Sequence, residues 1–261
     1  MFVFVFLLVT GIAVGLLSGI IGVGGGLIIV PVLIYLFKYT HYALVPQNSA
    51  LQTAIASSLL TVGLTASASV IAHYRQRSIR WDLWRRWILG LCLGALSATY
   101  VLSMMSTTWL STCFAIFLLM VAIKFLAQKS TLTATPAHPN PLSTPMSIFL
   151  FIAGMVIGLF SGLLGVGGGI LMTPLLIRLG CSMPESSGTS SASMLPLALI
   201  AGASYSINNP GYVYWPAVLI IGLTGVIVAP IGVKWSDRIS IKTGKRILAV
   251  LLLVVAIDLL T

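Results

Sequence analysis

The chain contains the stretch GLLSGIIGVGGGLIIVPVLI at residues 15–34 and repeats it at residues 158–177 as GLFSGLLGVGGGILMTPLLI. A shift of 143 positions aligns the two copies, and 13 of the 24 positions from residue 11 to residue 34 are then identical. The aligned polar and helix-breaking residues are Ser18 with Ser161 and Pro31 with Pro174. Shared apolar composition does not account for these matches, so the sequence predicts an internal duplication.

The composition around this repeat is typical of a membrane protein. Of the 261 residues, 58% are hydrophobic and 7% are charged, and the mean hydropathy is +1.09. Soluble domains carry about 25% charged residues, so water-soluble enzymes, coiled coils and disordered proteins are excluded. Cys92, Cys113 and Cys181 are an odd number of cysteines in or beside apolar runs and predict neither a disulfide framework nor a metal site. We expect an all-α integral membrane protein.

Eight helical segments are expected between the polar and helix-breaking clusters. They cover residues 2–37, 44–74, 85–103, 108–127, 146–177, 185–207, 213–233 and 245–260. The six tryptophans lie near the ends of these segments, as in an interfacial aromatic belt: Trp81, Trp84, Trp87, Trp109, Trp215 and Trp235. We expect a first repeat at 1–127, a Pro-rich cytosolic linker at 128–145 and a second repeat at 146–261. Each repeat then holds a glycine-broken first helix and three transmembrane helices.

The glycines of each repeat are predicted to have two roles. Glycines spaced four residues apart line one face of the first helix and let another backbone approach closely. They are Gly11, Gly15 and Gly19, matched by Gly154, Gly158 and Gly162. Three consecutive glycines follow at 24–26 and 167–169, and each costs about 1 kcal/mol of helix stability, so the helix is expected to break there. Pro31 and Pro174 then either occupy the first turn of a short second half-helix or kink it.

The placement of the 14 basic residues selects a topology. If all eight segments crossed the membrane once, seven bases would lie on each face. If each glycine-broken segment instead returns to the side from which it enters, 13 bases share one face and Lys38 alone lies on the other. That asymmetry is the positive-inside pattern. It predicts cytosolic loops at 75–86, 128–145 and 234–246, external termini, and two inverted repeats, as in secondary transporters.

The residues SGIIGVGGG followed by P-x-L, and SGLLGVGGG followed by P-L-L in the second half, resemble the duplicated signature of the TauE/SafE (sulfite exporter, TSUP) family of membrane transporter proteins. The resemblance extends over the whole chain, including the Ser/Thr-rich second helix of each repeat. It implies a multi-pass permease of the bacterial inner membrane for a small sulfur-containing anion such as sulfite, thiosulfate or a sulfonate. The family is functionally mixed, so substrate, direction of transport, coupling ion and oligomeric state, with a homodimer among the arrangements, stay open.

A small anion is expected to bind near the bilayer midplane, where the two GVGGG segments meet. No Lys or Arg lies inside a long apolar run, so the expected donors are backbone N–H groups at the half-helix N-termini and nearby hydroxyls. The predicted substrate-binding residues are Gly24, Gly25, Gly26, Ser57, Ser58, Gly167, Gly168, Gly169, Thr189 and Ser190. The predicted hinge residues are Ser18, Pro31, Ser161 and Pro174. Glycine packing alone and Ser/Thr back-bonding within helices are the structural alternatives.

The remaining motifs and ionisable residues predict little further chemistry. Glu185 opens a helix of the second repeat and is the one candidate relay for a coupling proton, since no carboxylate lies in mid-span. His41, His73 and His138 lack metal-ligand spacing, so neither a metal nor a cofactor is expected. GVGGG has no strand before it and no lysine, which argues against a nucleotide loop. The basic run at 75–87 is interpreted as a topology anchor instead of a lipid-headgroup or RNA patch, and no nucleic-acid partner is expected.

The leading function is an anion permease that works by alternating access, with the anion and the lipid bilayer as its partners. An anion channel and a non-transporting membrane assembly factor are the alternatives, and only flux that saturates or exchanges distinguishes a carrier from a channel. An enzyme acting in the membrane needs a nucleophile with a base, or paired acids. Neither is visible in the sequence, so we expect no enzymatic activity.

Overall fold

The computed structural model describes residues 2–21, 24–39, 45, 49–127, 144–235, 252–253 and 256–257. The helices in these ranges are α1 (Phe2–Ile21), α2 (Gly26–Tyr39), α3 (Ala50–Arg75), α4 (Trp81–Met104), α5 (Thr107–Ala127), α6 (Thr144–Leu164), α7 (Gly169–Arg178), α8 (Met183–Asn208) and α9 (Trp215–Trp235), with a short 3-10 helix at Pro210–Tyr212. By length and composition, α3, α6, α8 and α9 can each cross a membrane. The described residues contain no strand, and the expected all-α membrane architecture is confirmed.

The start of α4 differs from the expected helix boundary. The helix begins at Trp81, so Arg85 and Arg86 lie in its first turns and only residues 76–80 form the connection from α3. Long basic side chains are tolerated there because their apolar stems can lie along the helix while the charged ends reach water. The helix expected at 245–260 lies outside the described residues except at 252–253 and 256–257, which are helical.

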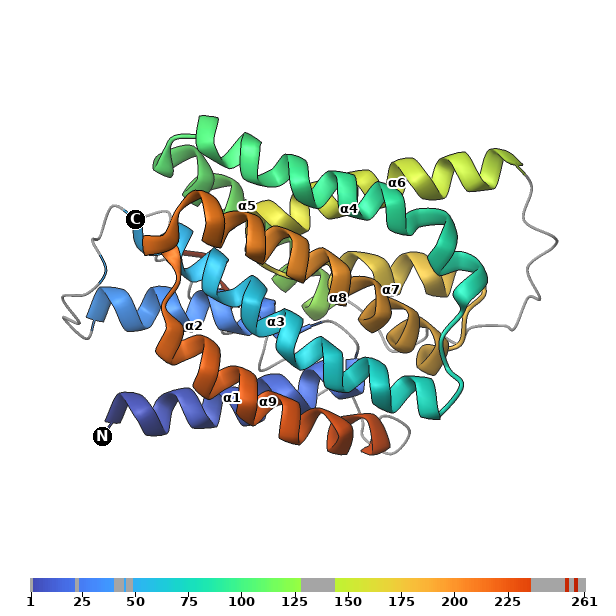
Figure 1. Cartoon of the computed structure of the whole chain (residues 1–261), viewed down its shortest axis with the longest axis horizontal. Helices are drawn as coiled ribbons and strands as arrows, with labels where there is room; N and C mark the ends of the chain where they lie inside the picture. The colour runs from blue at the N-terminus through green and yellow to red at the C-terminus, as the bar shows by residue number, and fades with distance from the viewer. Residues whose placement is uncertain are drawn as a thin grey trace.

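Helices from the two halves of the chain pack in exchanged pairs. The first helix of each half lies along the fourth helix of the other half, so that α1 packs on α9 and α6 packs on α4, while α3 and α8 pack on each other (Figure 1). In Figure 1 the colour gradient shows α3 and α8 running in opposite directions. This arrangement is compatible with an inverted repeat, and the inversion itself stays a prediction. The halves interlock, because neither first helix has its main partner within its own half.

The glycines spaced four residues apart make these exchanged contacts, as predicted. A Cβ built on Gly15 would lie 2.8 Å from the carbonyl oxygen of Gly225 in α9, and one built on Gly154 would lie 2.6 Å from the carbonyl oxygen of Trp87 in α4. A side chain at either position would therefore push the two backbones apart. The small residues set the distance between paired helices.

The predicted aromatic belt holds for some tryptophans and is wrong for Trp87. Trp81, Trp109 and Trp215 expose large parts of their side chains, as residues at a membrane interface do. Trp87 is fully buried, and its indole N–H donates to the hydroxyl of Ser193 in α8 at 3.0 Å. It belongs to the contact between α4 and α8 instead of the surface.

The two ends of the bundle differ in charge. In Figure 1 the connection from α3 to α4, the start of α6 and the end of α9 lie at one end, which we call the basic end, and the turn from α8 to α9 lies at the other. The basic end carries Arg75, Arg77 and Arg80. Most of the predicted loops 128–145 and 234–246 lie outside the described residues. The assignment of the basic end to the cytosol stays a prediction.

Candidate functional site

Both GVGGG segments break their helices, as predicted. The chain leaves helical structure between α1 and α2 and between α6 and α7. Gly26 and Gly169 are the first residues of the second half-helices, so each break ends before the last of its three consecutive glycines, and the second break begins at Gly165. The described glycines of the breaks with left-handed backbone are Gly24 (φ 69°), Gly165 (φ 69°), Gly167 (φ 75°) and Gly168 (φ 80°). These conformations explain the residue choice, because glycine alone adopts them without a Cβ penalty.

The two breaks touch each other through their backbones. A Cβ built on Gly26 would collide with the carbonyl oxygen of Gly165 and would lie 2.7 Å from the Cα atom of Val166. The first residue of α2 therefore lies directly against the start of the second break. This contact joins segments that are about 140 residues apart in the sequence. The two GVGGG segments were expected to meet, and here they do.

Two side chains from the central helix pair lie against both breaks. A Cβ on Gly24 would lie 2.6 Å from the sulfur of Met194, and one on Gly167 would lie 2.7 Å from a methyl carbon of Val62. Met194 belongs to α8 and Val62 to α3, and both are fully buried. Neither residue could be singled out from the sequence, since an apolar side chain in an apolar helix has no distinguishing pattern.

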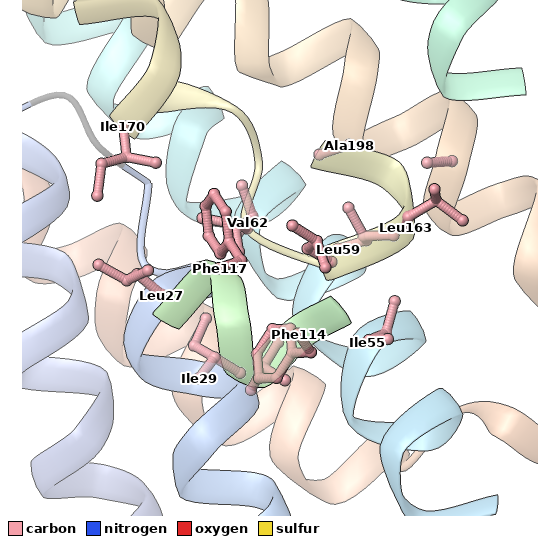
Figure 2. Close-up of a cluster of buried hydrophobic side chains, with 14 of the residues drawn as sticks. Leu27, Ile29, Ile55, Leu59, Val62, Phe114, Phe117, Leu163, Ile170 and Ala198 are labelled. Carbon is pink, nitrogen blue, oxygen red and sulfur yellow. The ribbon is translucent and has the colours of Figure 1, made fainter. Parts of the chain in front are cut away.

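Apolar side chains of α2, α3, α5 and α7 lie around this junction. Figure 2 shows Leu27 of α2, Val62 of α3 and Phe117 of α5 gathered close to Ile170 of α7. All four side chains are buried. A dry, apolar setting of this kind lowers the local dielectric constant and strengthens each interaction with a charge. It also makes an uncompensated charge costly.

The start of α7 carries uncompensated polar groups. No side chain caps this helix, whose N-cap is Gly168. The hydroxyl of Ser161 is buried without a hydrogen-bond partner and would lie 2.7 Å from a Cβ built on Gly168. A small pocket lies beside it, lined by Phe117, Phe160, Ser161, Leu164, Val166, Gly168, Ile170 and Leu171. Ser18, the equivalent of Ser161 in the first repeat, is likewise buried without a partner.

The four predicted substrate-binding hydroxyls go to different places. Ser58 donates to the carbonyl oxygen of Gly165 at 2.7 Å and is therefore part of the junction. Two have partners away from it: Ser57 accepts from the backbone N–H of Tyr214 at 2.8 Å, and Thr189 accepts from the backbone N–H of Arg80 at 2.9 Å. Ser190 lies 4.0 Å from the sulfur of Met172, whose terminal methyl carbon would lie 2.7 Å from a Cβ built on Gly168. The structure thus brings Ser58 to the two breaks and gives Ser57 and Thr189 backbone contacts between helices.

The comparisons with known proteins agree with this architecture. The sulfite exporter TauE/SafE family matches residues 7–259. The chain belongs to the TauE/SafE family. A "Probable membrane transporter protein" of Haemophilus influenzae is 28% identical, with 99% of each chain covered. The "Probable membrane transporter protein YunE" of Bacillus subtilis is 26% identical over 98% of this chain and 97% of its own length. No solved structure matches the chain.

Membership of the TauE/SafE family makes this a multi-pass membrane protein of a transporter family. A relative from the archaeon Methanocaldococcus jannaschii, also named a "Probable membrane transporter protein", is 27% identical over 97% of this chain. The three relatives thus come from two bacteria and an archaeon and match almost from end to end. Their names state transport and no substrate.

The two prolines of this TauE/SafE chain do not lie in the first turn of their half-helices. Pro31 and Pro174 are each the sixth residue of the helix that contains them, α2 and α7 respectively. The first-turn alternative is therefore wrong. A proline at this depth cannot donate to the carbonyl group four residues earlier, which is Leu27 in α2 and Ile170 in α7. Each short half-helix thus carries a weakened first turn next to its glycine break.

Glu185, the predicted coupling residue, has the contacts of a helix cap. It forms a capping box with Ser182, whose backbone N–H donates to the carboxylate at 2.8 Å. Nη1 of Arg80 lies 3.8 Å from the other carboxylate oxygen of Glu185, and Nη2 of Arg80 lies 2.7 Å from a carboxylate oxygen of Asp82. The hydrogen bond to Asp82 raises the pKa of Arg80. These contacts hold the start of α8 against the start of α4, and a role for Glu185 in coupling stays a prediction.

A buried histidine lies next to this cap. The sequence had been used only to exclude it as a metal ligand, and no other role was predicted for it. His73 is fully buried at the basic end of α3. Its Nδ1 atom lies 3.0 Å from the hydroxyl of Ser78, and its Nε2 atom lies 3.5 Å from the hydroxyl of Ser187 in α8. The spacing of polar residues along α3 was a signal for it, because Thr53, Ser57, Thr61, Thr65, Ser69 and His73 follow one another four residues apart.

No metal centre is found in the part of the chain that the structure describes. No group of three His, Cys, Asp or Glu residues there could hold an ion. Cys181 lies near Glu185, but it is buried, and burial raises the pKa of its thiol to about 11. A thiol that keeps its proton at neutral pH is a poor metal ligand and a poor nucleophile.

Proposed function

We propose that this TauE/SafE chain is a permease that carries a small anion, a sulfur oxyanion or sulfonate, by alternating access. The observation that supports this most is the backbone contact between the two helix breaks, with Gly26 against Gly165. Discontinuous helices that meet between the repeats of a transporter typically form its substrate site. The proposed site comprises both breaks, with Ser58 beside them.

An anion at this junction would be held by dipoles instead of a fixed positive charge. The start of a helix presents unpaired N–H groups and about half a positive charge, and that of α7 has no side-chain cap. The unpartnered hydroxyls of Ser161 and Ser18 add one donor from each repeat. Donors of this kind suit oxygen-rich anions, and each is strengthened by the apolar surroundings.

The exchanged helix pairs suit a rocking movement about this junction. The α1–α9 and α6–α4 pairs are packed backbone to backbone through glycine, so each pair is expected to move as one unit. The breaks join these pairs to the short half-helices α2 and α7, and left-handed glycines there can absorb changes in φ and ψ. Alternating access needs such rigid arms about a fixed site.

The proposal is tested by flux measurements with the purified protein in lipid vesicles. Labelled sulfite, thiosulfate, sulfoacetate and taurine are supplied separately, with protein-free vesicles as the control. A carrier gives uptake that saturates and an efflux of label that is accelerated by unlabelled anion on the opposite side. Uptake that rises linearly with concentration and shows no exchange would identify a channel. Absence of flux for all four compounds would overturn the proposal and favour an assembly role.

A further inference from the structure

We propose that His73 is the protonation site through which this transporter couples proton movement to its anion, an inference that rests on the proposed function. His73 is a buried imidazole of α3, and within the described residues its ring has no ion-pair partner. Its surroundings come from three elements: Ser78 from the connection to α4, Ser187 from α8, and the backbone of Gly19 from the last turn of α1. The ring therefore joins the basic ends of three helices.

The hydrogen bonds around His73 identify the nitrogen that takes the proton. The hydroxyl of Ser78 donates to the backbone carbonyl of His73 at 3.1 Å, so its single hydrogen is already used. It can then only accept from the ring, which places a hydrogen on Nδ1 of the neutral imidazole. The lone pair of Nε2 is left facing the hydroxyl of Ser187. An added proton binds at Nε2 and gives a singly charged imidazolium.

Protonation changes the contact between His73 and the first repeat. The neutral Nε2 atom can accept a hydrogen bond but cannot donate one. The protonated ring donates from both nitrogens, and the backbone of Gly19 lies within hydrogen-bond reach of the ring. Gly19 lies five residues before Gly24, the left-handed glycine of the first break. A proton at His73 thus favours the contact with the helix turn that leads into the proposed anion site.

A buried polar stripe connects His73 with the level of the breaks. Thr53, Ser57, Thr61, Thr65, Ser69 and His73 are spaced four residues apart on α3 and are all buried. This stripe of 20 residues is about 30 Å long, which matches the hydrocarbon core of a bilayer. Ser69 is hydrogen-bonded to Ser191 of α8 at 3.1 Å, and the hydroxyl of Thr53 has no partner. Thr61 and Thr65 donate to backbone carbonyls within α3, so the stripe is a row of buried polar groups and not a continuous hydrogen-bonded chain.

The charged groups near His73 are occupied elsewhere or exposed to solvent. Arg75 on its own helix and Arg77 on the connection to α4 are exposed. Arg80 is bonded to Asp82 of α4 and lies near Glu185 of α8, and α1 has no ionisable side chain. Lys234 in the last turn of α9 is exposed as well. Among the described residues, no fixed charge therefore does what a proton on His73 would do. An anion that moves with one proton carries one less net charge through a site without lysine or arginine, where charge is costly.

His73 is a coupling residue and does not touch the substrate in this account. It lies 11 residues beyond Val62, about 16 Å along the helix axis. The test must therefore measure coupling as well as flux. Uptake of the four labelled compounds is measured under two conditions. In the first, the vesicle interior has the external pH; in the second, the interior is about one pH unit more alkaline than the outside. External pH and membrane potential are held constant, so the charge of the external anion does not change.

The wild type is expected to accumulate its anion about tenfold more with this gradient if one proton accompanies each anion. His73→Gln keeps hydrogen-bonding groups but does not titrate, so it should exchange labelled for unlabelled anion at equal pH and show no response to the gradient. Arg75→Gln is the matched control, since it removes an exposed neighbouring charge, and it should respond as the wild type does.

Two results would overturn the coupling and leave the proposed function intact: wild-type uptake that ignores the gradient, or a full response in His73→Gln. Absence of flux for every compound in the wild type would overturn both proposals. If His73→Gln does not fold, His73→Asn takes its place. If neither folds, Ser187→Ala is used, and its uptake is measured as a function of pH. Loss of the hydroxyl next to Nε2 must shift the pH at which uptake is half-maximal, and an unchanged pH would refute the assignment of the coupling proton to His73.

Discussion

Replacing Gly26 with alanine places one methyl group where the two helix breaks touch. Gly26 is the first residue of α2 and has an ordinary helical position, so alanine meets no backbone strain there. Its Cβ would collide with the carbonyl oxygen of Gly165 and press on Val166. These are backbone atoms, which cannot turn aside as a side chain does. The two breaks must therefore separate to admit the methyl group.

Gly63→Ala is the matched control for this substitution. Gly63 is a buried glycine within α3, and its Cβ would come closest to a methyl group of Leu199, at 3.2 Å. Alanine gains about 1 kcal/mol over glycine in a helix, and this gain applies to both variants. Overpacking against backbone costs about 1–3 kcal/mol and applies only to Gly26→Ala. The two variants should thus differ by about 1–3 kcal/mol in unfolding free energy.

The difference is measured by thermal unfolding of both purified variants in detergent, together with anion uptake in vesicles. At about 2–4 °C per kcal/mol for a chain near this size, Gly26→Ala should melt several degrees below Gly63→Ala. If the same cost of about 1–3 kcal/mol falls on one transport state, its uptake should fall about 5- to 150-fold, since about 1.4 kcal/mol corresponds to a factor of ten. Equal melting temperatures and equal uptake in the two variants would show that the contact between the breaks is not needed.

Four further substitutions and one native cysteine test other parts of the structure. Gly168→Val puts a branched side chain at φ 80°, a strain of about 1–3 kcal/mol, and should abolish uptake while the protein still inserts; normal uptake would show that the left-handed turn is dispensable. Ser58→Ala leaves a buried carbonyl of the second break unpaired and should lower the unfolding free energy by about 1–3 kcal/mol, whereas an unchanged melting curve would contradict the bond. In a cysteine-free background, an impermeant maleimide applied to intact cells should label Gly211→Cys and spare Gln76→Cys, because these exposed positions lie at opposite ends of the bundle; the opposite pattern would reverse the topology. Native Cys181, whose burial raises its thiol pKa to about 11, should react with a maleimide at neutral pH only after unfolding, and reaction in the folded protein would contradict its burial.

The helix breaks and the glycine packing could be predicted because each depends on local chemistry. Three consecutive glycines destabilise a helix wherever they occur, and glycines four residues apart always share a face. Because the glycine motif is duplicated, the break predicted in the first half also predicted a break in the second half. The exchange of helix pairs between the halves, with α1 on α9, could not be predicted, since a duplicated sequence allows each half to pack on itself as well as on the other.

The partners of the polar side chains were the least predictable part of the site. The serines and threonines at the start of α8 look alike in sequence, yet Thr189 binds the backbone before α4 and Ser193 binds Trp87. Which hydroxyl reaches the junction depends on helix rotation, and a rotation of about 100° separates adjacent residues. His73 stands at the end of a predicted span, where a side chain can point to water or to the core, and only its four-residue spacing from Ser69 and the polar residues before it indicated the buried face.

Some buried hydroxyls of the described residues donate to a nearby carbonyl, and others have no partner. Thr61 and Ser193 donate to carbonyls of the preceding helix turn, as such residues do in membrane helices generally. Burial of a polar group without a partner costs about 1–3 kcal/mol, and the hydroxyls in this position belong to Ser18, Thr53, Thr99, Ser161 and Thr173. Among these, Ser18 and Ser161 alone occupy equivalent positions of the repeat, each in the last turn before a break. A cost carried at one site can be an accident of packing, but the same cost at both equivalent sites, beside backbone that the glycines keep open, supports the proposal that each half contributes a donor to one anion site.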